Sequence, residues 1–408
     1  MLVQKVNFDE VVQKIHKKYE LEYPSKCKPN PNSAEGTIIA SVFAVDGKKT
    51  EILTLSSGAK CLNEVDLKRE NVNGRLIHDS HAEILSLRSF NLLVMNHMKR
   101  LLGNKDFSFS SENLEQNDIM SQMICFSKPE KRFKWINNKY KLGLYISHCP
   151  CGDCSVVAEQ NLDKIEYEKW EDDHVKQYIM PENKTLLRGR NNVTKLGFVR
   201  SKPGRMDSIP SFSKSCTDKL LQKQLLGINN SLTYDLLDGM EIFLDYLVLP
   251  QPETYRKADE IKNCFKRVHS LNPFDVAFTN EKFINSIQTL DGRVKSSTNA
   301  SGIMILDHES TTGKYIFEGL QDGVKLGYTT KQKKPLRKNC QSRVSRYEMY
   351  KLYLSIKEDI DVTKDITRMS YLDFKNSLTE REIALETIRK MMSPDGWIKT
   401  HSDNFEII

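Results

Sequence analysis

Two short motifs limit how this chain can fold more than any other feature of its sequence. His-Ala-Glu at residues 81–83 opens a predicted helix, residues 81–102, whose apolar side chains recur along its length. Pro-Cys-Gly-Asp-Cys at residues 150–154 follows the short apolar run 142–146, which predicts a strand that leads into a helix N-terminus. Alone, His-x-Glu occurs by chance, and Cys-x-x-Cys is more typical of structural zinc or buried thiols. Together and in this order they predict a catalytic metal site between the two elements.

This pairing of motifs is typical of zinc-dependent nucleobase deaminases. Three protein ligands leave the fourth tetrahedral position of zinc to water, and the ion lowers the pKa of that water from ~15.7 to ~7. Glu83 stands two residues beyond His81 and can pass a proton from the water to the ring nitrogen and the leaving ammonia. Glu83 is therefore the predicted catalytic residue.

His81 and Cys151 are predicted ligands, and the sequence offers two candidates for the third. The Cys-x-x-Cys spacing favours Cys154. The other candidate is Cys216, which lies in Ser-Cys-Thr-Asp-Lys at residues 215–219, just before an amphipathic helix. A cysteine at a helix N-terminus has its thiolate favoured by the exposed N–H groups. The spacing alone leaves the choice open.

The remaining elements predict an α/β or α+β fold around one sheet. Two strands over residues 37–45 and 50–55 are joined by Asp46-Gly47, a dipeptide that favours a hairpin turn. A further strand is expected over residues 242–249, and helices are expected over residues 6–19, 216–226, 343–357 and 374–392.

The composition indicates a protein with a buried core in a reducing compartment. Of 408 residues, 39% are hydrophobic and 28% are charged, which disfavours disorder. No apolar run reaches the ~18 residues of a membrane span, the first residues turn polar at once, and the nine cysteines are an odd number. We therefore expect an intracellular protein of the nucleus and/or cytoplasm, with no membrane partner and monomeric.

Two basic stretches suggest a polyanionic partner, which the net charge of +7 permits. Residues 184–205 and 325–346 contain no acid, and such runs can contact the phosphates of RNA, which gives affinity without sequence information. The octapeptide at residues 331–338 has three open interpretations: a solvated loop, an RNA contact or a nuclear localisation signal.

The three blocks around residues 81, 151 and 216 closely resemble the adenosine deaminase domain of enzymes acting on RNA. Arg-Ser-Lys-Pro-Gly-Arg at residues 200–205 resembles the tRNA-specific branch, which converts adenosine 37 of eukaryotic tRNA(Ala) to inosine. Further matches are Ser-Gly-Ala-Lys-Cys at 57–61, Lys-Leu-Gly at 325–327, Ser-Arg at 342–343 and Trp-Ile-Lys at 397–399. The resemblance extends from about residue 37 to the end of the chain.

The resemblance implies a single editase domain over residues 1–408 with a cytidine-deaminase-like three-layer core and a central mixed sheet. The deaminase core is expected in about residues 37–102 and 141–250, with a polar insertion in about 104–140. The C-terminal helical part, about 251–408, is expected to enclose inositol hexakisphosphate.

The resemblance also selects among the candidate site residues. It implies His81, Cys151 and Cys216 as zinc ligands and Glu83 as proton shuttle, because the family usually has a small non-ligand residue where Cys154 stands. The positions that match the family's inositol hexakisphosphate ligands are Lys60, Arg88, Lys219, Arg346, Tyr371, Lys375, Trp397 and Lys399. Departures from the family pattern, which imply a sparser or rearranged set of ligands, are Leu87, Lys223, Arg381 and Leu385.

Arg88 supports a buried anion independently of the resemblance. It stands among apolar neighbours on the predicted buried helix, and a charge in such a place needs an anionic partner.

Three other functions are consistent with these motifs. A cytidine deaminase uses the same zinc and acid, and the block around Cys216 is what favours adenosine. A double-stranded-RNA editase shares the catalytic domain, but the flank before residue 37 offers little room for a duplex-binding domain. A non-catalytic RNA-binding subunit would be expected to lose its acid, whereas Glu83 is retained.

Overall fold

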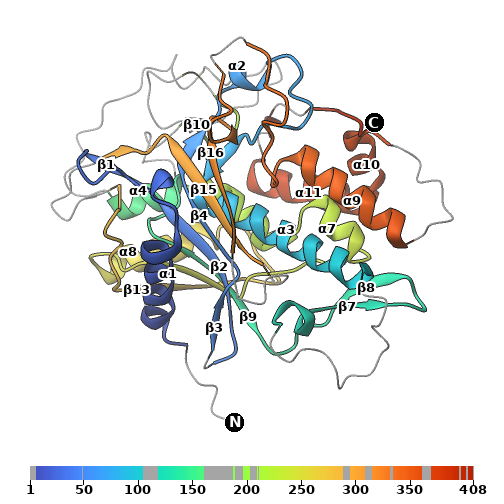
Figure 1. Ribbon diagram of the computed structural model, residues 1–408. Helices are drawn as coiled ribbons and strands as arrows, with labels where there is room; N and C mark the ends of the chain where they lie inside the picture. Colours follow the sequence, from blue (N-terminus) through green and yellow to red (C-terminus); the bar gives the residue numbers. More distant parts are fainter. Residues whose placement is uncertain are drawn as a thin grey trace.

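The computed structural model describes residues 6–47, 49–103, 118–159, 187–188, 196–202, 209, 211–287, 295–307, 315–330, 334–360, 369–394, 397–400 and 403–407. Within these ranges nine strands form one sheet in the order β13-β12-β9-β2-β4-β15-β16-β17, with β3 paired to β2 (Figure 1). The strands β9, β12 and β13 run parallel to one another, and every other pair of neighbouring strands in this sheet is antiparallel. The predicted central mixed sheet is confirmed.

The bounds of these strands are β2 (Ile39–Val45), β3 (Thr50–Ile52), β4 (Thr54–Ser57), β9 (Lys141–Ile146), β12 (Tyr246–Pro250), β13 (Asp275–Thr279), β15 (Ala300–Leu306), β16 (Tyr315–Gln321) and β17 (Val324–Lys325). The hairpin predicted at Asp46-Gly47 joins β2 to β3, and Gly47 takes the positive φ of 91° that such a turn requires. The predicted strand 50–55 is divided at Leu53, and β12 begins later than predicted.

Helices cover both faces of the sheet. The burial of every residue of β2 shows this, since side chains on both faces of the strand are shielded from solvent. Val42 and Ala44 belong to the core cluster that contains α3 (Ala82–Gly103), whereas Ile39 and Phe43 pack with α1 (Phe8–Glu22). Successive side chains of a strand point to opposite faces, so this uniformly apolar run requires cover on both. Figure 1 shows α1 and α3 on opposite sides of β2. The result is the expected three-layer arrangement.

Several shorter helices begin at residues that cap them. The helices α2 (Glu64–Leu67), α6 (Cys216–Leu226), α7 (Ser231–Leu236), α8 (Tyr255–Cys264) and α10 (Tyr371–Ser377) follow Asn63, Ser215, Asn230, Thr254 and Ser370, respectively. Each capping side chain accepts a hydrogen bond from a backbone N–H of the first turn, which satisfies a donor that the helix itself leaves unpaired.

The C-terminal helices lie beside α3 and α7, as Figure 1 shows in orange and red. Here α9 (Arg346–Ile360) packs against α3, and α11 (Thr379–Met392) packs against α6. The helix predicted over 374–392 is two helices, α10 and α11, because Leu378 leaves the helical region with ψ of 64°. None of the described helices has the length and apolar character needed to cross a membrane.

The segment predicted as a polar insertion, residues 104–140, is polar only in its first part. Residues 104–117 lie outside the described ranges. Residues 118–140 form the short 3-10 helix η2 (Met120–Gln122) and a hairpin of β7 (Ile124–Ser127) and β8 (Arg132–Trp135). Met123 and Phe133 are buried in the main core, so the second half of this segment belongs to the folded core.

Small paired strands complete the structure. They are β1 (Glu35–Gly36) with β14 (Ser296–Ser297), β5 (Ala59–Cys61) with β6 (Asp79–His81), and β10 (Leu187–Arg188) with β11 (Arg200–Ser201); the 3-10 helix η1 (Ser25–Cys27) follows α1. The β5–β6 pair leads into α3, and β9 leads into α4 (Asp153–Glu159).

Candidate active site

The N-termini of three helices bring the sequence-predicted metal ligands together. His81 directly precedes α3, Cys151 lies two residues before α4, and Cys216 is the first residue of α6. One ligand atom from each side chain lies within 4.8 Å of the other two. In the described part of the chain this is the one such group of His, Cys, Asp or Glu side chains. One imidazole and two thiols are a donor set that suits Zn²⁺ and leaves a fourth position open.

Cys154, the alternative that the spacing favours, lies outside this group. Its thiol is completely buried beside Cys149. Burial, and next the hydrogen bond with Cys149, raise the pKa of Cys154 well above its usual range. The geometry therefore favours Cys216 over Cys154.

The turns that carry the two cysteines are in direct contact. The backbone N–H of Cys216 donates to Cys151 Sγ at 3.2 Å, and the N–H of Thr217 donates to the carbonyl oxygen of Cys151 at 3.0 Å. Gly152 has a positive φ of 109°, and a Cβ at this position would lie 2.3 Å from Ser215 Oγ. Glycine between the Cys and Asp of this motif is thus required by both backbone conformation and space.

Asp79 orients the imidazole of His81. Its Oδ1 lies 2.7 Å from His81 Nδ1 and accepts the backbone N–H of His81 at 3.1 Å. This contact leaves Nε2 as the imidazole nitrogen that is available to a metal. A carboxylate on the second ring nitrogen of a ligating histidine fixes its tautomer and makes it a better donor.

Lys202 joins this carboxylate to one of the thiols. Its Nζ donates to Asp79 Oδ2 at 2.8 Å and to Cys216 Sγ at 3.1 Å. Lys219 also contacts Asp79 Oδ2. Burial alone would raise the pKa of Asp79, but Lys202, Lys219 and His81 together hold it well below its usual range. Asp79 is therefore a carboxylate with cations on each side.

The contact between the two thiols shifts their pKa values in opposite directions. A hydrogen bond from Cys216 is the largest influence on Cys151 and, with Lys202 and His81, lowers its pKa well below the usual range against the opposing effect of burial. Burial, and next the contact with Cys151, raise the pKa of Cys216. Cys151 is accordingly the more acidic of the two thiols, and Lys202 offers a positive charge to the sulfur of Cys216.

Glu83 lies in the first turn of α3, two residues after His81, and its charge is close enough to Cys216 to raise the pKa of that thiol. Its side chain is only 2% exposed, and its Oε2 has no hydrogen-bond partner among the described residues. Unpaired buried carboxylate oxygens are costly and mark functional positions. An acid in this place can exchange a proton with a water or substrate bound beside it.

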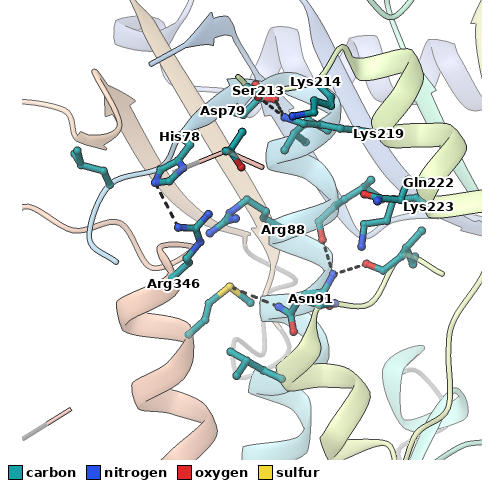
Figure 2. A pocket seen from close by; sticks show the side chains of 18 of the residues that line it. His78, Asp79, Arg88, Asn91, Ser213, Lys214, Lys219, Gln222, Lys223 and Arg346 are labelled. Atoms are coloured by element: carbon teal, nitrogen blue, oxygen red, sulfur yellow. Dashed lines mark hydrogen bonds and ion pairs between the residues drawn. The ribbon is translucent and has the colours of Figure 1, made fainter. Parts of the chain in front are cut away.

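A second feature is a basic cavity of about 330 Å³ between α3, α6, α9 and the C-terminal segment (Figure 2). Of the residues expected to bind inositol hexakisphosphate, five line it: Arg88, Lys219, Arg346, Tyr371 and Trp397. Figure 2 shows Arg88 and Arg346 close together on one side and Lys214, Lys219 and Lys223 on the other.

The other three expected ligands lie outside this lining. Lys60 is exposed and donates to Asn299 Oδ1 at 2.8 Å. Lys399 is 74% exposed and lies 3.9 Å from Glu386, and Lys375 lies 3.8 Å from Glu382. Lys60 and Lys399 therefore have polar or charged partners at the surface, whereas Lys375 is half-buried and paired with Glu382.

Three cations that the resemblance did not supply line the cavity instead: Lys214, Lys223 and Arg389. Burial, and next the neighbouring cations, lower the pKa of Lys214 and of Lys223 to about 7. Burial, and next Arg346, lower the pKa of Arg88 to about 10. Asp79 is the one acid among the described residues of the lining, so the charge of these side chains favours an anion in the cavity.

The four residues that depart from the family pattern lie in different surroundings. Leu87 and Lys223 line the cavity, and Lys223 adds a positive charge to it. Arg381 is buried elsewhere, where its Nε donates to Glu241 Oε1 at 2.6 Å. Leu385 is a buried apolar residue outside the lining. Arg381 therefore already has an internal partner, and this chain has its own arrangement of cations.

Sequence reasoning did not identify Asp79 and Lys202 as parts of the site. Lys202 and Arg200 belong to the acid-free run 184–205, which we interpreted as an RNA contact. Both side chains are buried, and both are paired with carboxylates, so that interpretation is wrong for these two residues. Lys223 was named only as a departure from the family pattern; its position four residues after Lys219 on α6 indicates that it adds a cation to the same helix face.

Comparison with known proteins agrees with this geometry. Residues 54–400 match the model of the adenosine-deaminase (editase) domain. The chain is 35% identical to "tRNA-specific adenosine deaminase 1" of Saccharomyces cerevisiae, over 93% of this chain and 90% of that protein. Its Schizosaccharomyces pombe counterpart of the same name is 28% identical over 89% and 88%. "Double-stranded RNA-specific editase Adar" of Drosophila melanogaster is 23% identical over 49% of this chain and 27% of that protein.

A buried acid beside a His-Cys-Cys cluster, on a mixed sheet covered by helices, defines a hydrolytic deaminase. The chain belongs to the adenosine-deaminase (editase) domain family, and it is an enzyme of that class.

Proposed function

We propose that this chain is a zinc-dependent hydrolase that converts adenosine to inosine in tRNA, with adenosine 37 of tRNA(Ala) as its substrate. The observation that carries the proposal is the grouping of His81, Cys151 and Cys216 within 4.8 Å beside the buried Glu83. The Saccharomyces cerevisiae and Schizosaccharomyces pombe relatives, both named as tRNA-specific, match nearly the whole chain, whereas the Drosophila melanogaster double-stranded-RNA editase matches about half of it at lower identity. This difference supports tRNA as the substrate class.

The proposed chemistry assigns a task to each side chain. His81 Nε2 and the two cysteine sulfurs would hold zinc, which when bound lowers the pKa of a water molecule and supplies the nucleophile for C6 of adenine. Glu83 takes a proton from that water, delivers it to the ring nitrogen N1, and assists transfer to the amino group, which leaves as ammonia. Because Glu83 is 2% exposed, bulk water competes little for its protons.

Asp79 and Lys202 support these roles without contacting substrate. Asp79 holds His81 with Nε2 toward the metal position, and Lys202 stabilises negative charge on Cys216 Sγ, 3.1 Å away. The Asp79 contact fixes the tautomer that leaves Nε2 for a metal, and the Lys202 contact favours the thiolate form of Cys216.

The target base has to leave its stack to reach a buried carboxylate. This costs least in a loop, where stacking is incomplete, and an adenosine next to the anticodon meets that condition. We propose that exposed basic residues of the 325–346 run, Lys334, Arg337, Lys338 and Arg343, contact tRNA phosphates. Lys331 and Lys333 of the same run lie outside the described residues. Each lost phosphate contact should reduce the salt dependence of binding.

We further propose that the basic cavity holds inositol hexakisphosphate. The residues fit such a ligand: six cations and Trp397 surround about 330 Å³, and Gln222 Nε2 and Arg389 Nε are buried without hydrogen-bond partners among the described residues. Buried cations without counter-charges are strongly unfavourable, and phosphates bound to them would remove that cost.

Comparing three substrates tests the reaction. The purified chain is incubated with tRNA(Ala), with an adenosine-containing RNA duplex, and with an anticodon stem-loop that carries cytidine in place of the target adenosine. We expect inosine in the tRNA at position 37 and none in a transcript with guanosine there. Faster deamination of the duplex, or formation of uridine from cytidine, would overturn the assigned substrate.

Analysis of the small molecules released on denaturation tests the cavity ligand. We expect about one inositol hexakisphosphate per chain from the wild type and a substantial loss from Arg88→Met. The control is Lys399→Met, because this lysine is 74% exposed and outside the lining. Equal ligand content in all three proteins, or none in the wild type, would contradict the proposal.

A further inference from the structure

A buried network of four charged residues also connects the turns that carry Cys151 and Cys216. Asp153 and Asp218 each stand two residues after one of these cysteines, and the partners of both carboxylates include Arg200 and Arg267. All four side chains are largely buried: Asp153 is 3% exposed, Asp218 1%, Arg200 0% and Arg267 11%. Two acids and two arginines make the network neutral.

Arg267 spans both turns with one guanidinium group. Its Nη1 lies 3.4 Å from Asp153 Oδ2, and its Nη2 contacts Asp218 Oδ1. Arg267 lies shortly after α8, far along the chain from either turn. A planar guanidinium with several fixed donors can hold two carboxylates at a defined separation, which a single ammonium cannot do.

Arg200 connects the same two acids by a second route. Its Nε donates to Asp153 Oδ1 at 2.5 Å, while its backbone N–H donates to Asp218 Oδ2 at 2.8 Å. Its carbonyl oxygen accepts the N–H of Ser215 at 2.7 Å, directly before Cys216. The acids also lie in the first turns of α4 and α6, where negative charge stabilises a helix N-terminus.

We propose that Arg267 is a positioning residue that sets the separation of the two cysteine sulfurs and thereby the metal affinity of the site. This inference rests on the proposed zinc site. Without Arg267, Asp153 keeps Arg200, but Asp218 becomes a carboxylate with 1% exposure and no side-chain cation among the contacts described above. The two buried carboxylates then repel each other and push the turns of Cys151 and Cys216 apart.

The variant Arg267→Met should weaken zinc binding by about 10- to 100-fold, as loss of groups that support metal ligands commonly does. Zinc affinity of the full-length protein is measured by competition with a chromogenic chelator, and cobalt(II) spectra report thiolate coordination. Arg267→Lys should give an intermediate loss. The control is Lys266→Met, which removes the same charge from an exposed neighbour and should leave both measurements unchanged.

A second variant separates positioning from stability. Adding Asp218→Asn to Arg267→Met removes the unpaired buried charge, so the midpoint of urea unfolding should recover. Zinc affinity should stay at least about tenfold below the wild type, because the bridge between the turns is still missing. Recovery of zinc affinity together with stability would show a purely structural role and overturn the inference. Failure of the wild type itself to bind zinc would instead refute the proposed metal site.

Discussion

Lys214 and Lys223 should make the ligand-free protein more stable as the pH rises above 7. In the folded protein the pKa of each is about 7, against an ordinary value of 10.5. Between these values the unfolded chain binds more protons than the folded chain, so the free energy of unfolding increases with pH. Below pH 7 both states are protonated, and this contribution to the slope disappears.

The size of the effect follows from the two shifts. Far above the folded pKa, each lysine contributes about 1.4 kcal/mol of stability per pH unit. Between pH 7 and pH 8, where each folded lysine is still losing its proton, the gain is about 1 kcal/mol per lysine and about 2 kcal/mol for both. Phosphates bound in the cavity would keep both ammonium groups charged in the folded state, so the ligand-bound protein should lack this slope.

Urea denaturation between pH 6.5 and 8.5 measures this difference. The protein is refolded without inositol phosphates, and unfolding is followed with and without added inositol hexakisphosphate. The double variant Lys214→Met/Lys223→Met controls for thiols and other groups that titrate in this range. A ligand-free wild type with the same pH slope as the double variant would refute the reasoning, and so would a slope that the ligand leaves unchanged.

Four further substitutions test the metal site and the turn that carries Cys151. Lys202→Met should keep the fold but weaken zinc binding about tenfold or more, measured by chelator competition, because its ammonium lies 3.1 Å from Cys216 Sγ. Cys216→Ser should lose zinc while Cys154→Ser keeps about one ion per chain by elemental analysis; zinc retained in the former would contradict the assignment. Gly152→Ala should lower stability by about 1–3 kcal/mol in urea, because a Cβ there would lie 2.3 Å from Ser215 Oγ at a positive φ; an unchanged midpoint would be inconsistent with the geometry.

Much of the site could be predicted because several of its reactive side chains belong to short sequence motifs. His81, Glu83 and Cys151 stand at fixed offsets from element ends, and such offsets determine where side chains point. The choice between Cys154 and Cys216 could not be made from spacing, because it depends on which turn folds back onto Cys151. The backbone contact between Thr217 and Cys151 is a long-range feature that local patterns do not contain.

The roles of the basic residues were harder to predict, since a lysine has the same local pattern in a cavity and on a surface. Lys202 was expected at the surface, yet it is 5% exposed and paired with Asp79. Lys399 was expected at the cavity and is 74% exposed. Long side chains take their partners from the tertiary structure. Similarly, the division of the helix predicted over 374–392 depends on the backbone at Leu378.

The most direct test of the account is inosine formation in tRNA(Ala) by Glu83→Gln, with zinc content measured in the same samples. This variant should keep about one zinc per chain while its rate falls by at least about 10²–10⁴-fold, the usual contribution of a general acid–base. The control Glu253→Gln, at an acid whose side chain is 85% exposed, should match the wild type. Normal inosine formation by Glu83→Gln would contradict the central claim.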